Sequence, residues 1–147
     1  MKGEALQVRE YRLVPVGRAV ACEDPLREPG AVAEFIRQRI GSESRENFVA
    51  VYLDRRLQPI GWELIARGSV SCTVVHPREV FRGAILRGAS GVVVGHNHPS
   101  GLLDPSGDDC EITERLQECG KLVGIDLVDH VVVGPGGYWS FLERGML

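Results

Sequence analysis

The chain has 147 residues, 44% of them hydrophobic and 25% charged, so it is an ordinary globular protein with room for one domain but not for two. The formal net charge of −3 argues against a general electrostatic binder of nucleic acid, which needs an excess of Lys and Arg on one face. Because the chain has no apolar run near the ~20 residues of a membrane span, and residues 1–7 lack the apolar core of a signal peptide, we expect a cytoplasmic protein without a membrane partner.

The chain divides into an N-terminal arm and one domain. Residues 1–28 carry mixed charge and are predicted to be the arm, in which Tyr11–Val16 could form a short strand. Residues 29–147 are predicted to form the domain. Its first element is a helix over Pro29–Gly41, where apolar residues recur at helical spacing.

A β-hairpin is predicted after this helix. Phe48–Leu53 has the composition of a strand, Asp54–Gln58 that of a turn, and Pro59–Ala66 continues as the returning strand. Gly68 interrupts the pattern, and a third strand is expected at Ser69–Val75.

Helices and strands then alternate. Pro77 suits the first position of a helix that ends at Gly88. Gly91–Gly95 is short and almost entirely apolar, as expected of a strand buried on both faces. Pro99–Pro105 is a loop, and Ser106 is predicted to be the N-cap of the next helix.

That helix carries acidic residues in its first turn, where the helix dipole favours negative charge. Its core-facing stripe is predicted to be Ile112, Leu116, Cys119 and Val123. Strands are predicted at Leu127–Val133 and Tyr138–Leu142, joined by a glycine-rich turn. Because helices alternate with a central sheet, the fold class is α/β with antiparallel hairpin edges.

The four cysteines, Cys22, Cys72, Cys110 and Cys119, form no Cys-x-x-Cys pair, which excludes a zinc site built on such pairs. Cys110 and Cys119 are nine residues apart, so on one helix they face opposite ways and cannot form a disulfide within it. We expect four reduced, mostly buried thiols.

Three residues around the buried strand form a candidate metal site. His96 and His98 are two residues apart, so on a strand both imidazoles point to one side. Asp109 shares a helix face with the predicted apolar stripe and should point inward, toward the strand end. Two histidines and one carboxylate with a fourth position open are typical of catalytic zinc. A His-x-His pair alone is a weak signal, because two histidines at a strand end are more often just polar edge residues.

The spacing of these residues resembles a known signature. His96-x-His98, seven residues, Ser106, two residues and Asp109 are similar to the JAMM signature of the JAB/MPN metalloprotease superfamily. The resemblance implies a JAB/MPN-like single domain with a central mixed β-sheet and flanking helices.

Longer strings narrow the resemblance to the RadC-like branch of that superfamily. They are His96-Asn97-His98-Pro99-Ser100-Gly101, Val75-His76-Pro77-Arg78-Glu79 and Asp129-His130. The similarity covers about residues 29–147, which is most of the chain.

The resemblance also implies roles for individual residues. His96, His98 and Asp109 would hold zinc, and an upstream glutamate would act as general base on the metal-bound water. We assign that role to Glu46, from the short match in Arg45-Glu46-Asn47-Phe48. The alternative is Glu63, which otherwise is an exposed strand residue.

Four neighbouring residues have less specific interpretations. Ser106 could cap its helix, donate a hydrogen bond to a developing oxyanion, or do both. His130 is either a partner of a metal ligand or a core histidine. Asp108 is expected to face solvent, and His76 to be a structural histidine.

These residues favour a zinc-dependent hydrolase of amide bonds that acts on a peptide or protein, a JAMM-type peptidase or isopeptidase. One alternative is a non-catalytic metal-binding interaction module on the same fold. A DNA-associated repair factor is another; the RadC-like proteins usually carry an additional N-terminal helical region, whereas here residues 1–28 precede the match, so nucleic acid is not the expected partner. A zinc nucleotide deaminase is excluded because its His-x-Glu and Pro-Cys-x-x-Cys motifs do not occur.

Overall fold

The computed structural model describes residues 8, 10, 12, 14, 24–68 and 74–147. In these residues the elements are α1 (Pro29–Ile40), β1 (Asn47–Leu53), β2 (Pro59–Arg67), α2 (Pro77–Arg87), β3 (Gly91–Asn97), α3 (Gly107–Val123), β4 (Asp126–Gly134) and β5 (Gly137–Ser140). Cys22, Cys72, most of the strand predicted at Ser69–Val75 and part of that at Tyr11–Val16 lie outside the described residues.

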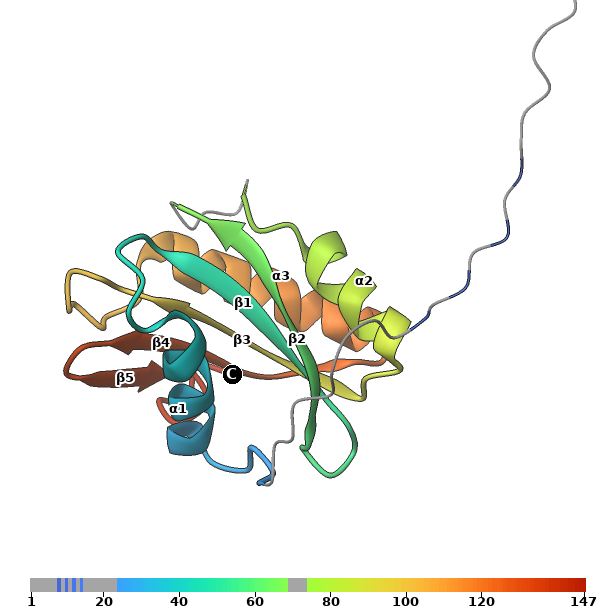
Figure 1. Cartoon of the computed structure of the whole chain (residues 1–147), viewed down its shortest axis with the longest axis horizontal. Helices are drawn as coiled ribbons and strands as arrows, with labels where there is room; N and C mark the ends of the chain where they lie inside the picture. The colour runs from blue at the N-terminus through green and yellow to red at the C-terminus, as the bar shows by residue number, and fades with distance from the viewer. Residues whose placement is uncertain (1–7, 9, 11, 13, 15–23, 69–73) are drawn as a thin grey trace, which may run out of the picture.

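The strands form one mixed sheet in the order β2-β1-β3-β4-β5, which Figure 1 shows. β1 pairs antiparallel with both β2 and β3, whereas β3 and β4 are parallel and are connected through α3. β5 returns antiparallel along β4. This architecture confirms the predicted α/β class and the central mixed sheet with flanking helices.

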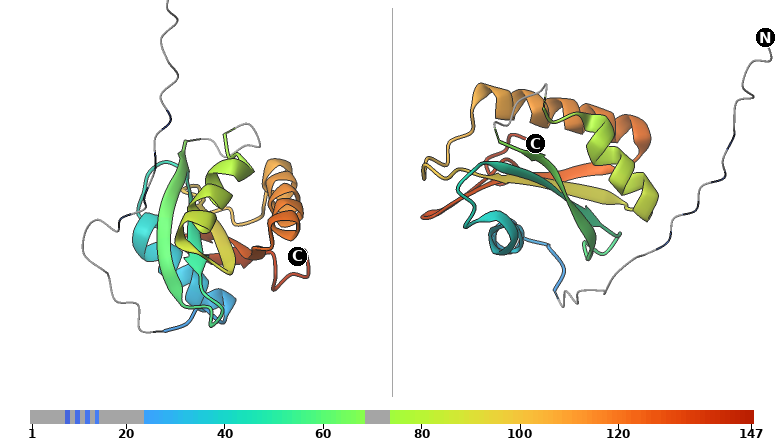
Figure 2. Two further views of the ribbon diagram at one scale, coloured as in Figure 1. Left: turned by 90° about the vertical axis from the view of Figure 1, so that its right-hand side faces the viewer. Right: turned by 45° about the horizontal axis from the view of Figure 1, so that its top comes forward.

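Helices cover both faces of this sheet, with α1 on one side and α2 and α3 on the other (Figure 2). Side chains of the interior strand β1 point alternately into two cores, one on each face of the sheet. Val49, Val51 and Leu53 pack with α1. Phe48, Ala50 and Tyr52 pack with the opposite layer. Every residue of β1 and β3 is buried, which explains their nearly continuous apolar sequences.

Local signals fix the helix ends. Pro29 and Pro77 occupy the first turns of α1 and α2, and the His76 imidazole accepts the Arg78 backbone N–H. At α3 the Ser106 hydroxyl accepts the Asp109 N–H while the Asp109 carboxylate accepts the Ser106 N–H, which makes a capping box.

Two predictions need correction, one about the core and one about the end of a strand. Val123 is exposed, because it is the last residue of α3 and the chain turns at Gly124 toward β4. The free thiols of Cys110 and Cys119 are half-buried, and Cys119 packs against the core beside the Ile112–Leu116 stripe.

The last predicted strand is also too long, because β5 ends at Ser140. There the Ser140 hydroxyl donates to the buried carboxylate of Asp129 and accepts the Glu143 N–H, which turns the chain out of the sheet. None of the helices in the described part of the chain is both long and apolar enough to cross a bilayer.

Candidate metal centre

The candidate site lies at one end of the sheet, where β3 ends and α3 begins. His96 is the penultimate residue of β3, and His98 follows directly after the strand. Asp109 is in the first turn of α3. The segment that joins α1 to β1 reaches the same end of the sheet, as the views in Figures 1 and 2 agree.

The fold brings the three predicted ligands together. The two Nε2 atoms of His96 and His98 are 3.0 Å apart. The Asp109 carboxylate places Oδ1 3.3 Å from His96 Nε2 and Oδ2 3.6 Å from His98 Nε2. One ligand atom from each residue thus lies within 4.8 Å of the others, in a group that could hold a metal ion.

The hydrogen bond that His98 makes on the side away from Asp109 shows which of its ring nitrogens carries the proton. Its Nδ1 contacts the backbone carbonyl oxygen of Leu102. A carbonyl oxygen only accepts, so Nδ1 must carry the proton. In the neutral imidazole the lone pair is therefore on Nε2, the atom that faces Asp109.

A longer hydrogen-bond chain gives the same result for His96. The Thr113 hydroxyl donates to the Asp109 carbonyl oxygen over 2.6 Å, so its oxygen accepts from His130 Nδ1, also at 2.6 Å. His130 Nε2 is then unprotonated and accepts from His96 Nδ1 at 2.9 Å. This leaves the lone pair of His96 on Nε2.

The resulting donor set fits a metal cation. Two imidazole lone pairs face each other at hydrogen-bond distance beside a carboxylate, and the outer bonds leave no proton between them. Such an arrangement is repulsive unless a cation or a proton occupies the middle. Two imidazole nitrogens and one carboxylate are ligands that suit zinc, and the outer partner of each histidine fixes its tautomer, as is usual at metal sites.

The electrostatics favour an ionised Asp109 carboxylate and a neutral His130. Burial raises the pKa of Asp109, but a proton on His96 Nε2, standing where a cation would, donates to the carboxylate and together with the Ser106 N–H lowers this pKa below its usual range. Burial lowers the pKa of His130 well below its ordinary value, so this fully buried histidine is neutral. Both interpretations of His130 agree with the structure, because it is completely buried and also contacts the candidate ligand His96.

The two candidate glutamates occupy different places. The β1–β3 register pairs Phe48 with His96, so Glu46, two residues earlier, comes next to His98. Its Oε1 lies 3.8 Å from His98 Nε2. Glu63 instead lies on β2, where it accepts the Tyr52 hydroxyl at 2.9 Å and pairs with Arg87 at 3.1 Å. It is a half-buried ion-pair residue, so the expectation of an exposed strand residue was wrong.

The remaining predicted residues lie at the start of α3. Ser106 is the N-cap, and its hydroxyl accepts the Asp109 N–H at 3.1 Å. Asp108 is exposed, as its position on the helix predicted.

Sequence reasoning missed Thr113 and Asn97. Thr113 could have been found, because a threonine four residues after Asp109 can bond that residue's carbonyl within a helix. Asn97 gave the weaker signal of a polar residue at the end of a buried strand.

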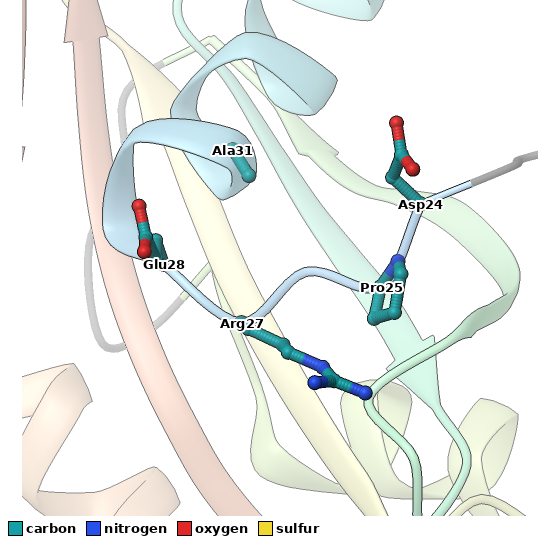
Figure 3. Close-up of a pocket in the computed structure, with 5 residues that line it drawn as sticks. All are labelled: Asp24, Pro25, Arg27, Glu28 and Ala31. Atoms are coloured by element: carbon teal, nitrogen blue, oxygen red, sulfur yellow. The ribbon is translucent and has the colours of Figure 1, made fainter.

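A hollow elsewhere on the molecule is not part of this group. It is lined by Asp24, Pro25, Arg27, Glu28 and Ala31, which precede α1 or belong to its first turn (Figure 3). None of them is a candidate ligand, so the candidate metal centre and this hollow are separate features.

Comparison with known proteins places the chain in a family. The RadC-like JAB domain model matches residues 26–146. The chain belongs to the RadC-like JAB family. This confirms the resemblance seen in the sequence, and the matched range includes Glu46, the three candidate ligands and His130.

Related proteins share the domain but are longer. The chain is 48% identical over 119 residues to a UPF0758 protein of Symbiobacterium thermophilum, covering 81% of this chain and 51% of that protein. It is 46% identical over 121 residues to one of Finegoldia magna, covering 82% and 54% respectively. With one of Methanosarcina acetivorans it shares 40% identity over 128 residues, covering 85% and 56%. The chain thus spans about half the length of the curated relatives it matches.

Proposed function

We propose that this chain is a zinc-dependent hydrolase of amide bonds, acting as a peptidase or isopeptidase. The observation that carries the proposal is the convergence of two imidazole lone pairs and the Asp109 carboxylate, with the Glu46 carboxylate beside them. We call His96, His98 and Asp109 the metal group. A metal group with an adjacent base suits the hydrolysis of a carbonyl substrate.

The ligands in this proposal are His96 and His98, each through Nε2, and the Asp109 carboxylate. Zinc held there supplies a Lewis acid that polarises a carbonyl and lowers the pKa of water to about 7. His130 and Thr113 keep the lone pair of His96 directed at the group. The Leu102 carbonyl does the same for His98.

Glu46 is the proposed general base. Its side chain is 35% exposed and 3.8 Å from His98 Nε2, so it reaches both the metal group and solvent. As the water oxygen bonds to the carbonyl carbon, Glu46 takes the proton. When the C–N bond breaks, Glu46 returns that proton to the leaving nitrogen.

Ser106 is a second proposed catalytic group. Its hydroxyl oxygen accepts the Asp109 N–H, and a hydroxyl that accepts can still donate its own proton. Placed next to the ligand helix, this O–H can stabilise the developing oxyanion. Loss of one such donor costs about 10²–10³-fold in rate in other enzymes.

The test combines metal analysis with a search for cleavage. The full chain, loaded with zinc, is incubated with a peptide library made from a digested bacterial proteome, and new peptide ends are identified by mass spectrometry. We expect cleavage by the zinc-loaded chain, none after chelation, and a fall of about 10²–10⁴-fold in Glu46→Gln.

Glu63→Gln is the matched control, because the Glu63 side chain is 34% exposed, nearly the same as Glu46, yet lies away from the metal group. It should cleave like the unmodified chain. Equal rates for Glu46→Gln and the unmodified chain would refute the assigned base. Zinc binding without any cleavage would favour an interaction module, and salt-sensitive DNA binding would favour a repair factor.

A further inference from the structure

Asn97 separates the two candidate ligand histidines and is itself only 2% exposed. Side chains alternate along a strand, so Asn97 points away from the side on which its two neighbours meet Asp109. Its carboxamide instead contacts the backbone of the segment that carries Glu46.

Three hydrogen bonds make this contact. Asn97 Oδ1 accepts the Asn47 N–H at 2.7 Å. Its Nδ2 donates to the carbonyl oxygens of Arg45, at 2.9 Å, and Glu43, at 3.3 Å. The two shortest bonds therefore hold the residues immediately before and after Glu46.

Only a carboxamide of this length satisfies all three partners. A backbone N–H can only donate and a backbone carbonyl can only accept, so the orientation of the Asn97 amide is fixed by its surroundings. An aspartate could accept from Asn47 but could not donate to Arg45 or Glu43, and an aliphatic residue could do neither.

The Asn97 bonds act where backbone pairing with β3 no longer supports the segment that carries Glu46. The β1–β3 register ends at the pair Phe48 and His96, and beyond it the side chain of Asn97 takes over from the backbone. Glu43 and Arg45 are exposed, so Asn97 is a buried anchor for an otherwise exterior stretch. On the β2 side, the Gly68 N–H donates to the Glu46 carbonyl at 2.7 Å.

We propose that Asn97 is a positioning residue that sets where the Glu46 carboxylate lies relative to the metal group. This inference rests on the proposed function, in which Glu46 is the general base. One tripeptide thereby holds both parts of the site: its histidines supply ligands, and its asparagine holds the base. A displacement of either part moves the other.

The first experiment measures kinetics on the full, zinc-loaded chain, with the library peptide that is cleaved fastest. Asn97→Ala should lower kcat by about 10²-fold, the cost of misplacing a catalytic group by about 1 Å, with KM and zinc affinity close to those of the unmodified chain. Combining it with Glu46→Gln should give no further loss beyond that of Glu46→Gln alone, because both changes remove the same contribution.

Two further variants separate positioning from stability. Tyr52→Phe is the control, since it removes one part-buried hydrogen bond from β1 at a distance from the site, and it should leave kcat unchanged. Asn97→Asp keeps the size of the side chain and the acceptor for Asn47 but loses both donated bonds, so it guards against a failure of Asn97→Ala to fold. It should also lower kcat.

The second experiment needs neither substrate nor metal. In the unmodified chain the Asn47 amide should exchange slowly with solvent deuterium, and Asn97→Ala should speed this exchange about tenfold, the equivalent of one hydrogen bond. The Val51 amide on the same strand should keep its rate.

The two experiments fail in different ways. If the unmodified chain cleaves no peptide, the proposed hydrolase function fails, and amide exchange still decides whether Asn97 holds the segment. If cleavage occurs but Asn97→Ala keeps its kcat, or multiplies the loss of Glu46→Gln, then Asn97 does not act through Glu46 and the inference is wrong.

Discussion

Two buried aspartates of this domain are held in opposite ways. Asp129 is surrounded by donors: it accepts the His130 and Leu142 N–H groups and the Ser140 hydroxyl. Asp109 instead faces the Nε2 lone pairs of two histidines. One carboxylate is satisfied by the protein alone, whereas the other belongs to a set of acceptors that could hold a metal ion.

The pKa shifts reflect this difference. Burial raises the pKa of Asp129 in spite of its three donors. Burial acts in the same direction on Asp109, but a proton on His96 Nε2, standing in place of a cation, and the Ser106 N–H outweigh it and lower the pKa. Burial alone therefore does not mark a functional carboxylate, and the direction in which its neighbours present protons or lone pairs is more informative.

The largest expected contrast comes from removing each carboxylate. Asp109→Asn should reduce bound zinc from about one ion per chain to almost none, because a neutral amide is a poor third ligand. Asp129→Ala should retain zinc but lower the free energy of unfolding by about 3 kcal/mol, since it leaves buried donors unsatisfied. Elemental analysis and urea denaturation measure the two effects. Loss of zinc from Asp129→Ala in folded protein would contradict the comparison.

A smaller effect on zinc affinity is expected from breaking the hydrogen bonds that link His96 through His130 to Thr113. Thr113→Val removes the acceptor for His130, so the orientation and tautomer of His96 are no longer fixed. Zinc affinity should fall by about tenfold, as for other outer partners of metal ligands. Thr113→Ser keeps the hydroxyl and should bind zinc like the unmodified chain, which competitive titration with a chelating dye can check.

The cluster of Tyr52, Glu63 and Arg87, whose side chains bond to one another, offers a test by pH. Burial and the bond to Glu63 raise the pKa of Tyr52 above its ordinary value of about 10. The unfolded chain therefore loses this proton first, so the stabilising contribution is complete below about pH 10 and declines as the pH rises further. Urea denaturation between neutral and strongly alkaline pH should show a shallower alkaline decline for Tyr52→Phe. Identical declines would refute the assignment.

The smallest expected effect concerns the N-cap of α3. Ser106→Ala should cost about 1 kcal/mol of stability through the lost cap. Ser106→Asp retains a cap acceptor without a hydroxyl donor, so it should recover the stability. If Ser106 also stabilises the oxyanion, this variant will not recover the cleavage rate; full recovery of both would limit Ser106 to capping.

Much of the fold could be predicted from the sequence because its signals are local. Proline at the first helical turns, the capping residues and the nearly continuous apolar runs of β1 and β3 each depend on a few adjacent residues. The same holds for the nearness of His96 and His98, and for the inward direction of Asp109. The errors at Val123 and at the end of β5 lie at element ends, where tertiary contacts decide the boundary.

The sequence by itself therefore determined the order of the elements that the structure describes and the three residues able to bind a metal, because periodicity and short spacing encode them. Only the tertiary structure placed Glu46, and not Glu63, beside the three candidate ligands, because that placement depends on the register between β1 and β3. It alone also brought His130 and Thr113 behind His96, and Asn97 against the segment of Glu46. Hydrogen bonds between residues far apart in the chain leave no periodic pattern in the sequence.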